Sequence, residues 1–320
     1  MPQHIQGNWR WCHKCEGLWF NGHATKGVCP AGGAHDLTGS GNYALIDTFP
    51  GGARQPNWRW CGKCEGLWFA GNITKGPCPA GGDHSQAGSG DYSIVHNTPS
   101  VPEQSNWRWC NKCQGLWFNG HATKGVCKAG GTHSSSGSGD YRIAQLPQNV
   151  RVHVKVLTAP SRFTVNEMLD GMRQVYNAVG IGVDLAGTEN LNLPALNDCD
   201  VGACSGAPTA EQVSLFSNRN NVGANDLVIY FVRSTVPAFN GCATHPAGQP
   251  GAVVASIASQ WTLGHEIGHV LGLAHCDTAM APLFDRLMTG QGTDNITNAP
   301  PDVIASEVST MKSSVLTVAA

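Results

Sequence analysis

The stretch Thr262-Leu-Gly-His-Glu-Ile-Gly-His-Val-Leu-Gly-Leu-Ala-His275 combines three histidines, one glutamate and a glycine at fixed intervals. In a helix of about 3.6 residues per turn, His265 and His269 project from one face, so both imidazoles can bind a single cation. Gly272 can adopt a left-handed conformation, which ends the helix and lets His275 approach from another direction. We therefore predict a metal centre with three nitrogen ligands and one open coordination position.

Zinc suits three imidazole ligands, and an open fourth position is typical of catalytic rather than structural zinc. Glu266 flanks the metal and does not ligate it, so it can take a proton from a water on the metal. The predicted reaction is amide hydrolysis by water, without an acyl-enzyme. The alternative is a buried helix that carries histidines by chance, with a core face of Leu263, Ile267, Val270 and Leu271. Five residues fixed at these intervals favour the metal site.

The pattern His265-Glu266-x-x-His269-x-x-Gly272-x-x-His275 resembles the metzincin clan of zinc endopeptidases. Met288, thirteen residues after His275, resembles the methionine turn that lies beneath the metal in that clan. The resemblance implies a cleft between an upper α/β subdomain and a smaller lower part that contains His275 and Met288. The segment 240–246 resembles pappalysin-like members. Gly290 stands where some subfamilies have a tyrosine ligand, so the subfamily stays open.

Composition limits the kinds of partner. Of 320 residues, 13% are charged and the formal net charge is -2, so no basic excess indicates nucleic acid or an anionic membrane surface. No apolar run is long enough to cross a bilayer. The partner that we expect is a protein or peptide substrate. The length allows two or three domains.

Four cysteines follow the repeats described below, namely Cys199, Cys204, Cys242 and Cys276. An even number is compatible with two disulfides and an oxidising compartment, so we expect a secreted protein, although no signal peptide is visible. The preferred pairing is Cys199 with Cys204 and Cys242 with Cys276, since the first pair closes a short loop. Free buried thiols are the alternative.

The first half of the chain is an internal repeat. Asn8-Trp-Arg-Trp-Cys12 recurs at 57–61 and at 106–110, in steps of 49 residues, which gives repeats over about 1–52, 53–101 and 102–147. Alternating side chains and dense glycines indicate short strands, and no helical period is present. The predicted architecture is therefore multidomain, with an all-β half over 1–147 and a metzincin-like α/β catalytic domain over 148–320. The repeats can close into one trefoil-like body or form successive small modules.

Each repeat contains the spacing Cys-x2-Cys-x13-Cys-x5-His. Three cysteines cannot all pair within one repeat, whereas three thiolates and one imidazole complete a tetrahedral zinc shell. We therefore favour a structural zinc ion in each repeat over disulfides. The predicted ligands are Cys12, Cys15, Cys29 and His35; Cys61, Cys64, Cys78 and His84; and Cys110, Cys113, Cys127 and His133.

Nine of the ten tryptophans lie in the repeats, three in each. Aromatic rings can stack on sugars, and a threefold site gains avidity on a glycan or cell surface. The alternative is that at least two rings per repeat form the core. Two hypotheses follow: a zinc endopeptidase that the repeats direct to a surface, or a glycan- or cell-surface-binding protein whose proteolysis is secondary or autocatalytic.

Residues 148–320 alternate strand and helix patterns. A substrate pocket wall is expected within 278–295. Acidic turns at 197–200 and 293–295 are candidates for calcium, but a solvated turn is the favoured interpretation of each. If the metzincin resemblance holds, the expected edge strand 238–244 pairs with extended substrate. We predict strands over 150–157, 181–185, 226–232, 238–244 and 252–258, and helices over 164–179, 209–217 and 301–311.

Overall fold

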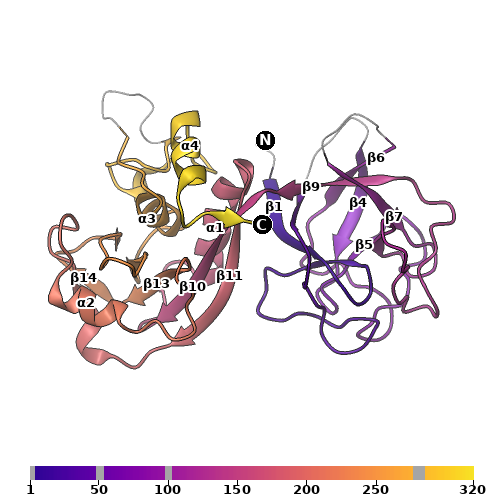
Figure 1. Ribbon diagram of the computed structural model, residues 1–320, viewed down its shortest axis with the longest axis horizontal. Helices are drawn as coiled ribbons and strands as arrows, with labels where there is room; N and C mark the ends of the chain where they lie inside the picture. The colour runs from indigo at the N-terminus through magenta and orange to yellow at the C-terminus, as the bar shows by residue number, and fades with distance from the viewer. Residues whose placement is uncertain (1–3, 48–53, 98–102, 277–284) are drawn as a thin grey trace. The chain divides into compact units, whose positions relative to one another are not determined.

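The computed structural model describes residues 4–47, 54–97, 103–276 and 285–320 of the chain. The chain divides after Pro147 into two compact units, and together they make a mixed α/β protein (Figure 1). Within the described residues, no helix has the length and apolar character needed to cross a membrane.

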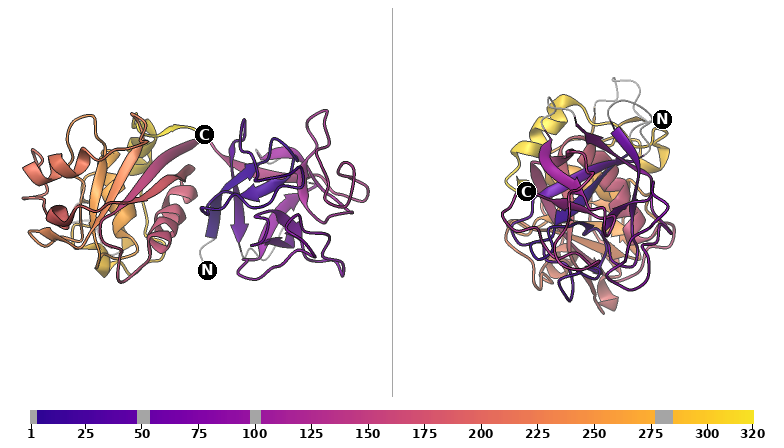
Figure 2. Two further views of the ribbon diagram at one scale, coloured as in Figure 1. Left: turned by 90° about the horizontal axis from the view of Figure 1, so that it is seen from below. Right: turned by 90° about the vertical axis from the view of Figure 1, so that its right-hand side faces the viewer.

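The first unit consists of short antiparallel strands, and each sequence repeat contributes three of them. The described residues of this unit contain strands and no helix, so the unit is all-β there. Figure 2 shows it as one body of short strands joined by long loops. The strands are β1 (His4–Trp11), β2 (Leu18–Phe20), β3 (Asn42–Asp47), β4 (Arg54–Trp60), β5 (Leu67–Phe69), β6 (Tyr92–His96), β7 (Gln104–Trp109), β8 (Leu116–Phe118) and β9 (Tyr141–Leu146).

The strand pairing makes this unit one large, nearly barrel-shaped sheet. In each repeat the first strand pairs with the other two, as β1 pairs with β2 and β3. The closing strands β3, β6 and β9 then pair with one another in all three combinations. Separate successive modules are therefore ruled out, because strands of different repeats share one sheet.

Aromatic side chains fill the interior of the first unit. Trp9, Trp58 and Trp107 are fully buried, and each packs edge-on against a tyrosine of another repeat. Two of the three tryptophans in each repeat are buried, so the core interpretation is correct for those two. The third, represented by Trp11, is half-buried.

The second unit is built on a six-stranded sheet. Its strands are β10 (Gln148–Val156), β11 (Ile181–Asn190), β13 (Leu227–Val232), β15 (Gly241–Cys242), β16 (Gly251–Ala255) and β17 (Val318–Ala319). The order β11-β10-β13-β16-β15 is parallel except for the antiparallel edge strand β15, and β17 pairs with β10.

Helices cover both faces of this sheet (Figure 1). The helices are α1 (Val165–Ala178), α2 (Ala210–Phe216), α3 (Thr262–Val270) and α4 (Ala305–Ser313). Alternate residues of β13 face opposite cores: Leu227, Ile229 and Phe231 belong to the core with α1 and α3, whereas Val228, Tyr230 and Val232 belong to the core with α2. This two-sided burial explains the continuous apolar run.

The predicted strands and helices of the second unit are present, with differences in their bounds and with additional short elements. Strand β11 continues to Asn190, because it pairs with β10 along its whole length. The expected loop 186–208 also contains the 3-10 turn η1 (Pro194–Leu196) and strand β12 (Asp198–Asp200), which pairs with β14 (Ser234–Val236). The edge strand is shorter than predicted. A further 3-10 turn, η3, spans Thr293–Asn295.

The predicted disulfide pairing is wrong. Cys204 bonds Cys242, while Cys199 and Cys276 are free thiols. Cys199 lies in β12, where burial raises its pKa to about 12. The turn after β12, with a left-handed Cys204, brings that residue to the edge strand instead.

Candidate active site and metal centres

The structure brings His265, His269 and His275 together. The Nε2 atoms of His269 and His275 lie 3.1 and 3.3 Å from Nε2 of His265. Nitrogens at tetrahedral corners around one zinc ion are about 3.3 Å apart, given bonds of about 2.0 to 2.1 Å. Gly272 has a φ of 102° and turns the chain between the helix and His275. The three nitrogens therefore fit one zinc ion.

Backbone carbonyls orient two of these rings. Nδ1 of His265 donates to the carbonyl of Leu287 at 2.7 Å, and Nδ1 of His269 donates to that of Leu273 at 2.8 Å. These bonds place the hydrogen on Nδ1 and leave the Nε2 lone pair free for a metal. Burial lowers the pKa of His265 to about 4 and also lowers that of His269, which keeps both rings neutral.

Met288 lies fully buried directly after the Leu287 carbonyl. The amide of Cys276 donates to the Met288 carbonyl at 2.8 Å, which ties the segment after His275 to this turn. Gly268 of α3 leaves room for the methionine, because a Cβ there would lie 2.6 Å from Met288 Sδ. Met288 thus packs beneath the helix that carries two of the histidines.

Glu266 is the buried acid of this site. Only 6% of it is exposed, and burial raises the pKa of its carboxyl to about 8. A bound cation would lower this pKa again by attraction. Edge strand β15 faces it, since a Cβ on Gly241 would lie 2.6 Å from the Glu266 side chain.

A cavity of about 710 Å³ opens over the three histidines and Glu266. Its walls come from edge strand β15, helix α3, the segment 289–293 and the loop that holds Cys204. Part of the predicted pocket wall, 278–284, lies outside the described residues.

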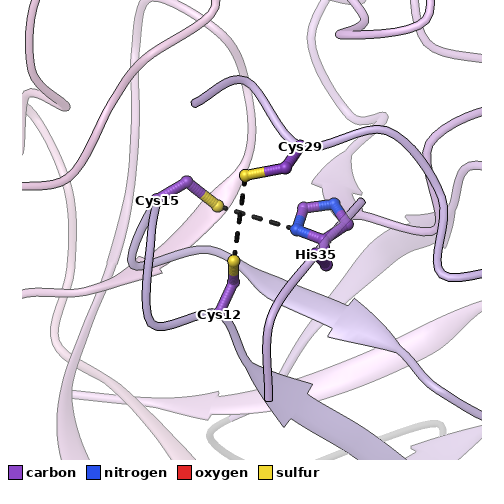
Figure 3. Close-up of side chains that lie close together, drawn as sticks. All are labelled: Cys12, Cys15, Cys29 and His35. Atoms are coloured by element: carbon purple, nitrogen blue, oxygen red, sulfur yellow. Dashed lines mark hydrogen bonds between the residues drawn. The ribbon is translucent and has the colours of Figure 1, made fainter. Parts of the chain in front are cut away.

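Three further clusters could hold metal ions, one in each repeat. In Figure 3 the thiols of Cys12, Cys15 and Cys29 point toward one another and toward Nδ1 of His35. Cys12 and Cys29 sulfurs are 3.8 Å apart, and Cys15 Sγ lies 3.7 Å from His35 Nδ1.

The other two clusters have the same geometry. Their corresponding sulfur–sulfur distances are 3.9 Å, and their sulfur–nitrogen distances are 3.6 and 3.5 Å. A tetrahedral zinc shell has edges of about 3.8 Å between sulfurs and about 3.6 Å between sulfur and nitrogen. A disulfide would hold two sulfurs about 2.05 Å apart. All nine thiols are free and buried, so the clusters could bind zinc and contain no disulfide.

The surroundings favour thiolates at these positions. Backbone amides of Asp36, Ser85 and Ser134 donate to the first cysteine sulfur of their repeats at 3.4 to 3.5 Å. A hydrogen bond from Cys64 lowers the pKa of Cys61 to about 3. Thiolates are the form of cysteine that binds metal.

Nothing in the described residues supports a calcium ion at the acidic turns, whose carboxylates make contacts within the protein. Asp198 accepts hydrogen bonds from Arg233 and Ser234, and the Arg233 bond lowers its pKa to about 2. Asp294 pairs with Arg162 and accepts from Asn240 at 2.8 Å. Their oxygens are thus engaged by the protein.

Sequence reasoning missed two features of the cleft. One is Gly241, whose close approach to Glu266 depends on where β15 lies. The other is the Cys204–Cys242 disulfide, which joins β15 to the loop at Cys204 that also lines the cavity. The segment 240–246 was noted for its resemblance and as part of the expected edge strand, but nothing in it indicated contact with Glu266.

Comparison with known proteins finds only weak similarity to solved structures. No family model matches the chain, and no curated protein matches it. Archaemetzincin from Methanopyrus kandleri is one similar solved structure, at 16% identity and a TM-score of 0.35, covering 51% of this chain and 94% of its own. Metalloproteinase-II from Bacteroides fragilis is another, at 14% identity and a TM-score of 0.37, covering 85% of this chain and 77% of its own.

Proposed function

We propose that this chain is a zinc-dependent endopeptidase of the metzincin type. One observation supports this most strongly: three Nε2 atoms converge at zinc spacing on the floor of a cavity, and a buried carboxylate lies beside them. Because the ligands are three histidines, one coordination position stays open toward the cavity.

Zinc bound there would supply a Lewis acid and lower the pKa of water. Glu266 would take a proton from the attacking water and give it to the leaving amine. Edge strand β15 would pair with an extended peptide through its outer backbone edge, which would hold the scissile bond over the histidines.

The repeats would hold three structural zinc ions, each bound by three thiolates and one imidazole. The sulfur–sulfur distances in the three clusters match those expected around one zinc ion in each, which supports three structural ions. A closed four-ligand shell of this kind stabilises a fold and leaves no position for substrate. The full chain would then bind four zinc ions.

A disulfide beside the active site supports a role outside the cell, because disulfides persist in oxidising compartments. The half-buried Trp11, Trp60 and Trp109 support surface targeting by the repeats, since one ring in each repeat remains partly accessible. A glycan array with the full chain tests this targeting role, and an array without binding would remove the glycan hypothesis.

Replacing Glu266 by Gln tests the proteolytic proposal. We expect cleavage of an unfolded protein substrate to fall about 10²- to 10⁴-fold, because the amide cannot take the proton. Zinc content should stay unchanged, because Glu266 is not a ligand. The matched control is Glu211→Gln, which lies outside the cavity wall and retains an oxygen for its bond to the Asp200 amide. Full activity of Glu266→Gln would contradict the proposal.

A further inference from the structure

Each repeat contains a tight turn around its first two cysteines, which we call the knuckle: residues 12–17, 61–66 and 110–115. In the first knuckle the Cys12 amide donates to the Gly17 carbonyl, and the Glu16 amide donates to the Cys12 carbonyl, both at 2.9 Å. The same two bonds recur in the other knuckles at 2.8 to 3.0 Å. The knuckle therefore positions two of the four ligands in its own repeat.

Each knuckle also accepts a backbone hydrogen bond from a neighbouring repeat. The Phe20 amide donates to the Glu65 carbonyl at 2.8 Å, the Phe69 amide to the Gln114 carbonyl at 2.9 Å, and the Phe118 amide to the Glu16 carbonyl at 2.8 Å. Repeat one thus docks on knuckle two, repeat two on knuckle three, and repeat three on knuckle one. The docking closes a ring.

Close packing at each junction depends on a glycine with a positive φ. Gly27 lies against the Cys64 carbonyl, and a Cβ there would lie 2.2 Å from that oxygen. Gly76 and Gly125 make the equivalent approach to the Cys113 and Cys15 carbonyls, at 2.4 and 2.1 Å. The second cysteine of each knuckle is therefore both a ligand in its own repeat and a docking surface for the preceding one.

The histidine ligands make the same connection. Nε2 of His35 donates to the Cys64 carbonyl at 3.1 Å, and Nε2 of His133 donates to the Cys15 carbonyl at 3.1 Å. In both rings Nδ1 faces its own cluster, so the other nitrogen carries the hydrogen. Each of these ligands is oriented by the knuckle of another metal cluster.

A side chain of each knuckle completes the junction. Glu65 accepts from Thr25 and pairs with His23 of repeat one, at 2.9 and 3.0 Å. Glu16 makes the same contacts with Thr123 and His121 of repeat three. At the remaining junction Gln114 accepts from Asn72 at 2.7 Å. The acid and the histidine are both replaced by amides there, so the hydrogen bond between the repeats is kept.

We infer that the three zinc sites of the repeats are thermodynamically coupled and lose or gain their metal together. Zinc in one repeat fixes its knuckle, and that knuckle orients the preceding repeat with its histidine ligand. Emptying one site loosens the surface on which the preceding site depends, and the closed ring carries the effect around. The inference rests on the structural zinc ions of the proposed function and does not depend on proteolysis.

The full-length chain provides the first test. It is equilibrated with increasing chelator and pulsed with a thiol-alkylating reagent, and the modified cysteines are then mapped by peptide mass spectrometry. Coupling predicts that all nine repeat cysteines become reactive in one transition, with few molecules that are modified in one repeat only. Independent transitions would overturn the coupling. Nine cysteines that react without chelator in zinc-saturated protein would instead show that no zinc is held there.

Two glycine variants sharpen the test. Gly27→Ala places a Cβ against knuckle two without changing any ligand. Gly32→Ala puts alanine at a larger positive φ, 97° against 60°, and has nothing within 4 Å of its Cβ. Coupling predicts that Gly27→Ala lowers the chelator concentration at the midpoint of cysteine exposure at least tenfold in every repeat. Gly32→Ala should change this concentration less than Gly27→Ala does. Equal effects, or an effect confined to one repeat, would overturn it. Should Gly27→Ala fail to fold, the wild-type titration decides.

Discussion

At the scale of single residues, the position of Glu266 in the cleft depends on the absence of a side chain at Gly241. Gly241 lies in β15 opposite Glu266, and any side chain there would meet the acid's Cγ, Cδ and Oε1. The contacted atoms are the far end of a flexible side chain, so the acid rather than the backbone would give way. Gly241 is therefore a positioning residue for Glu266.

Replacing Gly241 by Ala should lower kcat about tenfold or more, because it displaces the general base, whose contribution is about 10²- to 10⁴-fold. Zinc content and thermal stability should change little. The control is Gly187→Ala in β11, where the new Cβ would have ordinary contact at 3.6 Å from His153 Nδ1. In a Glu266→Asp background, the effect of Gly241→Ala should shrink, because the shorter acid avoids the methyl group. Unchanged kcat in Gly241→Ala would contradict this role.

The histidine spacing predicted from sequence agrees with the observed convergence, because helical geometry fixes where positions four apart project. The carbonyls of Leu287 and Leu273 could not be predicted, since backbone acceptors leave no sequence signature. Gly241 was missed for a related reason: its contact with Glu266 arises from the position of the strand in the fold, and a single glycine in a strand does not indicate what lies opposite it.

At the scale of elements, helix α1 shows how local sequence positions the site. Thr164 and Glu167 form a reciprocal capping box, with the Thr164 amide donating to the glutamate at 2.7 Å. The helix packs against α3, and Tyr176 donates to the Gly264 carbonyl at 2.9 Å in the buried interface. Helix α1, which this cap stabilises, thus supports the helix that carries His265 and His269.

Replacing Thr164 by Ala should lower the free energy of unfolding of the second unit by about 1 kcal/mol, because an amide at the helix start loses its acceptor. Thr164→Ser retains the hydroxyl and should lose much less. Guanidinium unfolding followed by far-ultraviolet circular dichroism measures both variants. Equal stability of Thr164→Ala and the wild type would show that the cap contributes nothing.

Elements were predictable where local signals agree. The cap at Thr164, the spacing of Met168 and Met172, and the apolar run of β13 each specified an element that the structure contains. The extension of β11 and the short β12–β14 pair were not predictable, because pairing partners distant in sequence create them. The disulfide was predicted wrongly because loop length favoured Cys199, whereas the fold places Cys204 beside the edge strand.

At the scale of the whole molecule, the two units are stabilised differently. The second contains a large core of aliphatic and methionine side chains. The first combines aromatic packing with three buried clusters of free thiols and histidine. A unit of this kind is expected to depend on metal for its folding.

Chelation should therefore unfold the repeats before the second unit. Nine of ten tryptophans lie in the repeats, so intrinsic fluorescence reports mainly on them. We expect a red shift of the emission on chelation and its reversal by added zinc, while the helical circular dichroism signal changes less. Emission that stays unchanged after complete zinc removal would show that the repeats fold without metal.

The most direct measurement is anomalous X-ray diffraction at the zinc absorption edge from crystals of the full chain. We expect an anomalous peak that marks a zinc ion bound by Nε2 of His265, His269 and His275, with no fourth protein ligand. We also expect one such peak in each cysteine cluster. A fourth protein ligand at the histidine site, or no peak there in zinc-saturated crystals, would contradict the proposed hydrolytic centre.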